Sequence, residues 1–450
     1  MKSPPHHIRL RRFERAYFKA SVGQAMMKAQ PKSLNPAGIK FWCLVCLALG
    51  VLANLCPAQE KVTLQRALEL ADLLHPQLDA GRAQVEVGEA GVLTANHYPN
   101  PEISLSAGRQ TFRIPGNVAG MASFYSFEQP LELGSLRPSR IQFADRFRET
   151  TVYALAEVRL AVLAGVRRTF FQVLRRRGEA EIATESLGLV EDLRRRIRVR
   201  VEVGEAGRLE LIRADAEVAT AATFANSVQL QLVTALAQFR AAVGAPLATA
   251  IEPEGILDPP ASFPSLEELR KAAREQHPAA KLAQSEVRRA ESRIAHEQAL
   301  RRPQPSLRAD IERYPDTPNY RVGITIPVPL WNRREGPIAE ATAALRQVRA
   351  LAQARQIQIL TALDGAYGRY QVASQQLAAF ELGLLREADE AVRATETAYQ
   401  LGERGILETL DAQRVLRTVR MGLLNTQYDR QAALVDLDEL RAVDLRSAKP

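Results

Sequence analysis

Two acidic residues near the C-terminal end of the chain are spaced so that their carboxylates could act together on a cation. Glu408 and Asp411 are three residues apart, and this spacing places two side chains on one face of a helix. Carboxylates that line a passage select for cations by simple electrostatics. A structural role is the alternative, because acids near a helix N-terminus also complement its dipole. The residues alone leave both interpretations open.

The rest of the sequence lacks the motifs of an enzyme or a metal centre. It contains no Ser/His/Asp order, no conspicuous pair of catalytic carboxylates and no glycine-rich phosphate loop. Past residue 58 the histidines are His75, His97, His277 and His296. Two of them, His75 and His277, precede proline, which favours a role at a helix end. We therefore expect no catalytic residue, no resident metal and no cofactor.

Residues 1–58 have the pattern of a secretory signal. Positive charges that end at Lys40 precede an apolar run at residues 41–55, and small residues precede Gln59 as at a cleavage site. The alternatives are an N-terminal membrane anchor, for which the apolar run is short, and a lipid-modified Cys56. Cleavage before Gln59 would direct the chain out of the cytoplasm.

Charge and cysteine content narrow the class further. Residues 1–58 hold nine basic residues and one Glu, so they account for +8 of the net charge of +9. The remainder is almost neutral, which argues against a nucleic-acid partner. All three cysteines (Cys43, Cys46 and Cys56) lie in the same segment. We expect neither a disulfide nor a thiolate metal site in a mature chain that begins at Gln59.

The chain beyond the leader is a tandem repeat with an offset of about 200 residues. His277-Pro278 repeats His75-Pro76, and the tip sequence YQLGERGILETLDAQ (399–413) repeats VEVGEAGRLELIRAD (201–215). Each copy has two alternating segments typical of strands and long proline-free stretches of strong helix formers. We predict a first repeat at 59–244, with strands at about 101–110 and 121–131 and long helices at 138–203 and 209–243. A linker follows at 245–264. The second repeat is expected at 265–445, with strands at about 305–314 and 319–328 and long helices at 337–401 and 406–443.

Four strands in one chain indicate an assembly of several chains. Each strand is about ten residues long with one apolar face, as in membrane barrels. Four strands cannot close a barrel, and lipid does not tolerate an open sheet edge. Three copies would supply twelve strands. The predicted fold is therefore mainly helical, with four strands per chain completing a twelve-strand barrel in a trimer that a helical tunnel continues; a soluble four-stranded sheet is the alternative.

The tandem repeat, the strand starts PNPEISL and RPQPSLR, the turn PLWNRREG and the tip YQLGERGILETLDAQ resemble the TolC family of outer-membrane efflux proteins. The resemblance covers about residues 60–445. The stretch from His75 to Leu105 most resembles the CzcC-like branch, which serves heavy-metal exporters. The resemblance implies an outer-membrane homotrimer that contacts lipid and extends into the periplasm. Its partners would be a periplasmic adaptor and an inner-membrane pump of the resistance-nodulation-division type.

The resemblance also implies roles for particular residues. Glu408 and Asp411 match acids that form a cation-selective ring at the periplasmic entrance. Arg404 and Tyr399 match residues that hold the entrance closed, and Glu210 matches an acidic partner of the arginine, so an ion pair between Glu210 and Arg404 is expected. The tip glycines would permit tight helix reversals and form the surface that the adaptor contacts: Gly204, Gly207, Gly402 and Gly405.

The leading hypothesis is thus a passive exit duct of a tripartite efflux system, with heavy-metal cations as possible cargo. A duct for multidrug efflux or type I protein secretion is an alternative within the family. A periplasmic coiled-coil scaffold without a barrel is an alternative from another class.

Overall fold

The computed structural model describes residues 60–111, 118–244, 251–257 and 264–442. The predicted leader, its cleavage site and Cys56 lie outside the described residues. The described residues belong to one unit of the chain.

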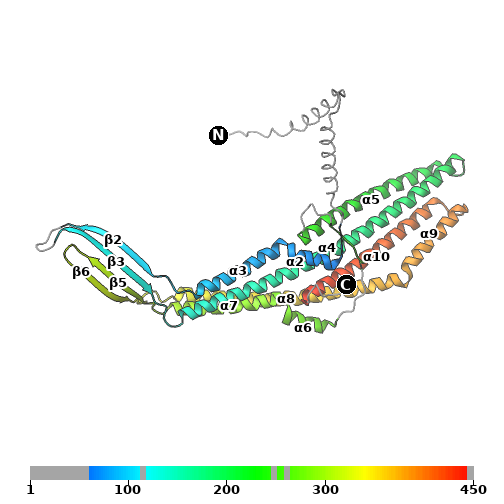
Figure 1. The fold of residues 1–450 in the computed structure, drawn as a ribbon. Helices are drawn as coiled ribbons and strands as arrows, with labels where there is room; N and C mark the ends of the chain where they lie inside the picture. The colour runs from blue at the N-terminus through cyan, green and yellow to red at the C-terminus, as the bar shows by residue number, and fades with distance from the viewer. Residues whose placement is uncertain (1–59, 112–117, 245–250, 258–263, 443–450) are drawn as a thin grey trace, which may run out of the picture. The chain divides into compact units, whose positions relative to one another are not determined.

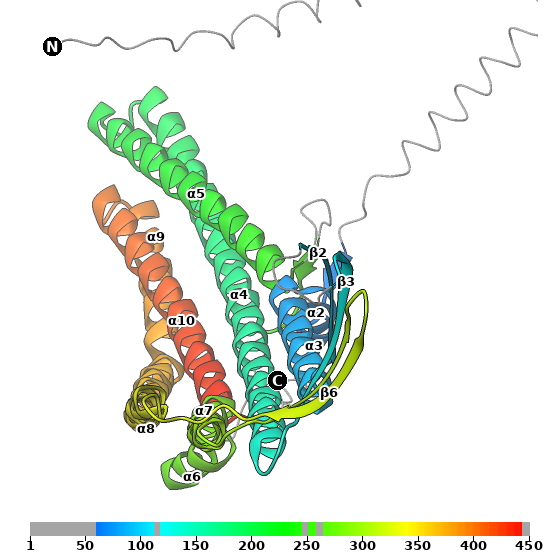
Figure 2. The same ribbon diagram turned by 90° about the vertical axis from the view of Figure 1, so that its left-hand side faces the viewer.

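The two halves of this unit have the same order of elements, with two shorter helices, two strands and two long helical stretches in each (Figures 1 and 2). The first half comprises α2 (Leu64–Leu74), α3 (Pro76–Asn96), β2 (Glu102–Gln110), β3 (Gly120–Pro130), α4 (Leu136–Glu202) and α5 (Arg208–Val243). The second half comprises α6 (Leu266–Gln276), α7 (Pro278–Leu300), β5 (Ser306–Arg313), β6 (Pro318–Thr325), α8 (Glu335–Ala379), the π-helical turn η1 (Phe380–Leu384), α9 (Leu385–Gln400) and α10 (Ile406–Leu440). Two short strands, β1 (Glu60–Val62) and β4 (Ile251–Pro253), pair with each other.

The four longer strands form one antiparallel sheet in the order β2-β3-β5-β6. Residues opposite one another in such a sheet lie on the same face. One face carries two successive apolar rows across all four strands: Ile103, Phe127, Ala309 and Val322, then Leu105, Tyr125, Ile311 and Tyr320. The other face carries a polar row: Ser104, Ser126, Asp310 and Arg321. The larger side chains of the apolar rows are exposed, and β2 and β6 leave two open edges.

Beyond shifts of one to three residues at element ends, the structure differs from the predicted elements in three main respects. The helix expected at 337–401 is interrupted by η1, where Gly383 adopts a φ of 134° that the α-helix does not allow. The strand expected to end at 328 ends at Thr325, because its partner β5 begins only at Ser306 and Pro327 cannot donate to a ladder. The segment expected to be a linker contains β4, which pairs in parallel with β1.

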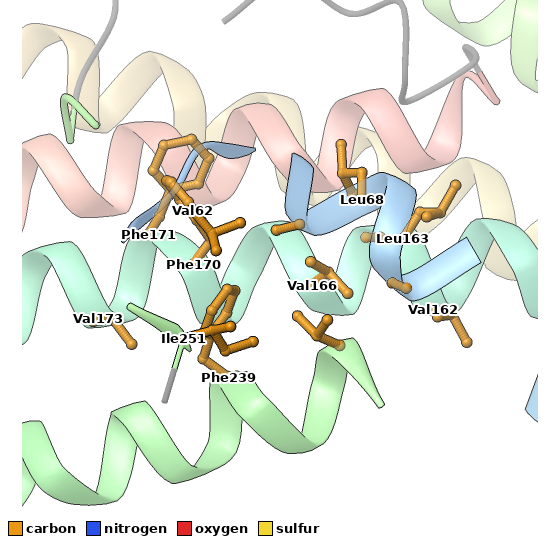
Figure 3. Close-up of a cluster of buried hydrophobic side chains, with 14 of the residues drawn as sticks. Val62, Leu68, Val162, Leu163, Val166, Phe170, Phe171, Val173, Phe239 and Ile251 are labelled. Carbon is orange, nitrogen blue, oxygen red and sulfur yellow. The ribbon is translucent and has the colours of Figure 1, made fainter. Parts of the chain in front are cut away.

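A buried apolar cluster holds α4 against α5 and against the β1–β4 pair (Figure 3). Phe170 and Phe171 of α4 are buried, and the Phe170 ring meets the Phe239 ring of α5 edge-on at 6.0 Å between centroids. Val62 and Ile251 close the cluster from the two short strands. The β1–β4 pair thus supplies apolar surface that the two long helices alone do not have.

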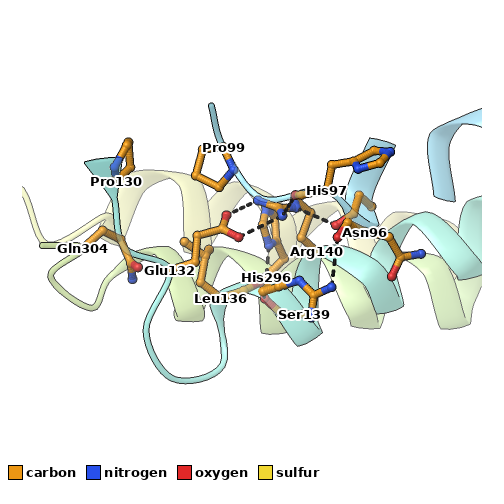
Figure 4. Close-up of polar contacts among 12 residues, drawn as sticks. Asn96, His97, Pro99, Pro130, Glu132, Leu136, Ser139, Arg140, His296 and Gln304 are labelled. Atoms are coloured by element: carbon orange, nitrogen blue, oxygen red, sulfur yellow. Dashed lines mark hydrogen bonds and ion pairs between the residues drawn. The ribbon is translucent and has the colours of Figure 1, made fainter. Parts of the chain in front are cut away.

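Polar contacts fasten the sheet to the helices that continue it (Figure 4). Arg140 of α4 donates to the carbonyl oxygens of Ala95 (3.1 Å) and His97 (2.8 Å), and its guanidinium also binds the Glu132 carboxylate (2.9 Å). The Arg140 side chain therefore ties the end of α3 to the segment that leaves β3. These bonds satisfy carbonyl groups that the helix end leaves open.

Candidate channel entrance

Both pairs of long helices reverse direction through the same backbone motif. At the first tip Glu205 N donates to Arg200 O (2.8 Å) and Gly204 N to Val201 O (3.1 Å), and Gly204 has a φ of 80°. These bonds define a Schellman motif, in which the left-handed position favours glycine. The left-handed backbone at this turn therefore explains why a glycine stands at position 204.

The second tip has the same motif one repeat later. Glu403 N donates to Ala398 O (2.9 Å), Gly402 N donates to Tyr399 O (3.1 Å), and Gly402 has a φ of 75°. Gly207 and Gly405 follow as extended N-cap residues of α5 and α10. All four predicted tip glycines thus lie in the two helix reversals.

Glu408 and Asp411 lie side by side on the exposed face of α10. Both residues are exposed, whereas their neighbours Thr409 and Leu410 are buried. Glu408 occupies the first turn of α10, as Glu210 occupies the first turn of α5. A dipole-complementing role therefore fits Glu408, but it does not account for Asp411, which lies one turn further along.

Tyr399 connects the two tips within one chain. Its side chain is 8% exposed and packs with Leu193, Ile197 and Ile406. The Tyr399 hydroxyl donates to Glu210 Oε2 at 3.3 Å. Burial, with a further contribution from the Glu210 carboxylate, raises the pKa of Tyr399, so the phenol keeps its proton and acts as the donor.

The predicted ion pair between Glu210 and Arg404 is not formed within the chain. Arg404 lies in the loop just after the Schellman turn, and its side chain is exposed and forms no ion pair with any residue that the structure describes. Tyr399 lies on the inward face of α9 and reaches Glu210 instead. The guanidinium of Arg200, on α4, lies 5.0 Å from the centre of the Tyr399 ring and adds a cation–π contact.

Sequence reasoning missed a second link between the tips, between Glu217 and Arg414. Glu217 is 4% exposed, and it accepts from Arg414 Nε at 3.2 Å and from Arg414 Nη2. The sequence did contain a signal for this link: Glu217 is a charged residue on the apolar stripe of α5, between the buried Ala214 and Ala221. A buried carboxylate at such a position needs a cationic partner.

A pocket of roughly 330 Å³ lies beside these links. Eight residues of α4, α9, α10 and the first tip line it: Leu193, Arg196, Arg200, Glu205, Glu396, Tyr399, Gln400 and Thr409. The described part of the chain contains no cluster of three or more histidine, cysteine, aspartate or glutamate residues that could hold a metal ion.

His75 and His277 cap helices. The Nδ1 atom of His75 accepts from Gln77 N at 3.3 Å, and the Nδ1 atom of His277 accepts from Ala279 N at 3.1 Å. Their position before proline predicted this role.

Among the described helices, none combines the length and the apolar composition that a membrane span requires.

A tandem pair of two-stranded units with long paired helices and matching tips defines a class of outer-membrane channel with a helical periplasmic extension. The model of the family "Outer membrane efflux protein" matches residues 67–245 and 269–442. The chain therefore belongs to the outer membrane efflux protein family, also called the TolC family, and is an outer-membrane efflux channel rather than an enzyme.

Three relatives align with most of this chain, and two of these three carry metal-resistance names. The cobalt-zinc-cadmium resistance protein CzcC of Cupriavidus metallidurans is 26% identical over 383 residues, which cover 84% of this chain and 90% of the relative. The nickel-cobalt-cadmium resistance protein NccC of Alcaligenes xylosoxydans xylosoxydans is 26% identical over 75% of each chain. The outer membrane efflux protein BepC of Brucella suis is 23% identical over 82% of each chain.

Solved structures have the same fold. The CusC structure superposes with a TM-score of 0.70 at 17% identity, covering 84% of this chain and 91% of CusC. The outer membrane protein VceC of Vibrio cholerae gives a TM-score of 0.72 at 16% identity, covering 84% of this chain and 95% of VceC.

Proposed function

We propose that three copies of this chain form a twelve-strand barrel in the outer membrane and an exit duct for a tripartite efflux system. The observation that carries the proposal is the four-stranded sheet, whose apolar rows are exposed and whose edge strands β2 and β6 are open. Exposed apolar side chains on one face suit lipid, and the polar row on the other suits a water-filled lumen. The open edges require pairing with neighbouring chains.

The long helices α4, α5, α8, α9 and α10 would continue the barrel as a periplasmic tunnel. A periplasmic adaptor would contact the tips at Gly204, Gly207, Gly402 and Gly405, and an inner-membrane pump of the resistance-nodulation-division type would supply the cargo. The duct itself would conduct passively. The described residues offer no metal cluster that would hold cargo tightly.

Divalent metal cations are the cargo that we favour. The names of CzcC and NccC support this choice. In a trimer, Glu408 and Asp411 would appear three times, and six carboxylates around the entrance would attract cations. The exposure of both side chains in one chain leaves them available for this ring.

A latch at the same end would keep the entrance closed at rest. Within one chain Tyr399 binds Glu210, while the exposed Arg404 would reach an acid of a neighbouring chain. Reversal of the charge with Arg404→Glu should then raise the conductance of the reconstituted channel, and an unchanged conductance would remove Arg404 from the latch.

The function is tested by a susceptibility panel on a strain that lacks this protein. The panel compares cobalt, zinc and cadmium with dyes and antibiotics, and complementation uses the unmodified protein and the Glu408→Ala/Asp411→Ala variant. Sensitivity to metals alone is the expected result. Sensitivity to organic compounds with metals unaffected would make the protein a multidrug duct, and a secretion defect without either would indicate type I protein export.

A further inference from the structure

The turn between β6 and α8 is built so that one tryptophan side chain projects outward. Asn332 Oδ1 accepts from Arg334 N at 3.0 Å, and Arg334 has the left-handed φ of 57°, which is uncommon for a residue with a side chain. The Arg334 guanidinium donates to Glu297 of α7 (Nε to Oε2, 3.2 Å) and so fastens the turn to that helix. Trp331, at the start of the turn, is 93% exposed.

Other exposed apolar side chains lie in the segments that join the sheet to the helices. Leu330 precedes Trp331, Leu133 lies between β3 and α4, and Tyr98 lies between α3 and β2; all three are exposed. Leu133 N donates to Gln304 Oε1 at 3.3 Å, which brings the loops after β3 and before β5 together. These segments lie where the sheet meets the helices (Figure 1). Aromatic and aliphatic side chains are therefore exposed to solvent at this junction.

Three arginines in these same segments have no acidic partner. Arg301 and Arg302 follow α7, and Arg333 lies in the Trp331 turn; all three are exposed and none forms an ion pair within the described part of the chain. Two exposed acids lie at the same junction, Glu335 at the start of α8 and Glu102 at the start of β2. The unpaired groups thus leave an excess of positive charge.

The neighbouring arginines differ in this respect. Arg137 donates to Asn96 O at 2.9 Å and lies over the Tyr98 ring, and Arg140 binds Glu132 (Figure 4). Arg137 and Arg140 are therefore engaged in contacts within the protein. Arg301, Arg302 and Arg333 remain able to bind an external anion.

We propose that these exposed groups form a lipid collar that binds anionic phospholipid headgroups on the side of the bilayer where the sheet joins the helices. The collar comprises Tyr98, Leu133, Leu330, Trp331, Arg301, Arg302 and Arg333. Tryptophan and tyrosine favour the membrane–water interface, and arginine pairs with phosphate through parallel hydrogen bonds. The inference rests on the proposed function, since it requires the sheet to lie in the membrane, and it adds a preference for lipids with net negative charge.

Trp331 makes the collar open to direct measurement. The chain has two tryptophans, Trp42 and Trp331, so the full-length Trp42→Phe protein carries a fluorophore only in the collar. The protein is reconstituted in mixed phosphatidylethanolamine and phosphatidylglycerol vesicles in which one lipid at a time is brominated. Bromine quenches tryptophan on contact, so the quenching reports which lipid, and which part of its chain, lies against Trp331.

We expect lipids brominated near the headgroup to quench Trp331 more than lipids brominated near the chain end. We also expect brominated phosphatidylglycerol to outcompete phosphatidylethanolamine by about fivefold for each arginine that contacts a headgroup. The Arg301→Gln/Arg302→Gln/Arg333→Gln variant should reduce this ratio to about one. The control is Arg198→Gln/Arg208→Gln/Arg213→Gln, which removes three exposed charges from the helical tips and should keep the preference.

Equal quenching by both lipids in the unmodified protein, or an unchanged ratio in the collar variant, would overturn the proposal. Flotation of the vesicles separates this failure from that of the proposed function. Protein that floats with the vesicles but shows no lipid preference contradicts the collar alone. Protein that does not float contradicts the membrane location of the sheet, and the collar with it.

Discussion

The Tyr399→Phe substitution removes one hydrogen bond between the two tips and leaves the ring in place. The hydroxyl donates to Glu210 Oε2 at 3.3 Å, and the ring keeps its packing against Leu193 and Ile406 and its contact with Arg200. The change therefore isolates the polar part of the latch. We expect it to favour the open entrance.

The structure sets the size of this effect. A hydrogen bond to a carboxylate contributes about 1.5–3 kcal/mol in favourable geometry, but 3.3 Å is long for an O–H donor and Glu210 is only half-buried. About 1 kcal/mol per chain is therefore the working value. If three chains open together, the sum of about 3 kcal/mol corresponds to a roughly 100-fold change in the ratio of open to closed channels.

Single-channel recording in a planar bilayer measures that ratio. Tyr399→Phe should raise the open probability, and Glu210→Ala should add little in the Tyr399→Phe background because both changes break the same bond. Tyr153→Phe is the control, since the half-buried Tyr153 has no hydrogen-bond partner among the described residues. An open probability unchanged by Tyr399→Phe, or fully additive effects of the two changes, would refute the latch.

Three further substitutions test the fold that holds the entrance. Burial, with a smaller contribution from the positive charge of Arg355, lowers the pKa of His277 to about 4. The neutral cap therefore stabilises the fold fully above about pH 6.5, and the free energy of unfolding falls by about 3 kcal/mol as the pH is lowered toward 4. The His277→Asn variant should keep a helix cap but lose this part of the acid sensitivity. Denaturant unfolding measured as a function of pH tests this. Gly383→Ala should lower the free energy of unfolding by about 1–3 kcal/mol, because a φ of 134° excludes a side chain. Asp438→Asn should cost about 3–5 kcal/mol in the same assay, because it leaves the 4% exposed Arg167 without its carboxylate at 2.8 Å.

Matched controls accompany these three changes. Gly365→Ala, in the regular part of α8, should stabilise the helix by up to about 1 kcal/mol. Glu340→Gln removes the exposed partner of Arg293 and should cost at most about 1 kcal/mol. Equal acid sensitivity in His277→Asn and the unmodified protein would contradict the argument for the cap. An unchanged free energy of unfolding in Gly383→Ala would contradict the argument from backbone strain. A loss of stability in Asp438→Asn no larger than in Glu340→Gln would contradict the argument for the buried ion pair.

Elements that depend on local pattern could be predicted from the sequence. The offset between Gly204 and Gly402 indicated two equal tips, and the structure has the same Schellman motif at both. The prolines before β5 indicated where that strand begins, whereas the predicted end of β6 at 328 lay beyond the observed end at Thr325. Each of these features is set by residues close together in the chain.

Features that depend on distant partners could not be predicted. Gly383 resembles Gly365 and Gly368 in its helical sequence context, yet only Gly383 of the three lies in a π-helical turn. The strands β1 and β4 are three residues long and pair across about 190 residues, too short for periodicity to reveal. The partner of Glu210 within one chain depended on which side of α9 faces α5: the contact is with Tyr399, and a pairing of Arg404 in the assembled entrance stays a prediction.

The reversal potential of the reconstituted channel across a salt gradient tests the central claim most directly. We expect the unmodified protein to conduct with a preference for cations, and the Glu408→Ala/Asp411→Ala variant to lose that preference while it retains conductance. Conduction without cation preference in the unmodified protein, or an unchanged preference in the variant, would contradict the assignment of these carboxylates to the entrance of a cation duct.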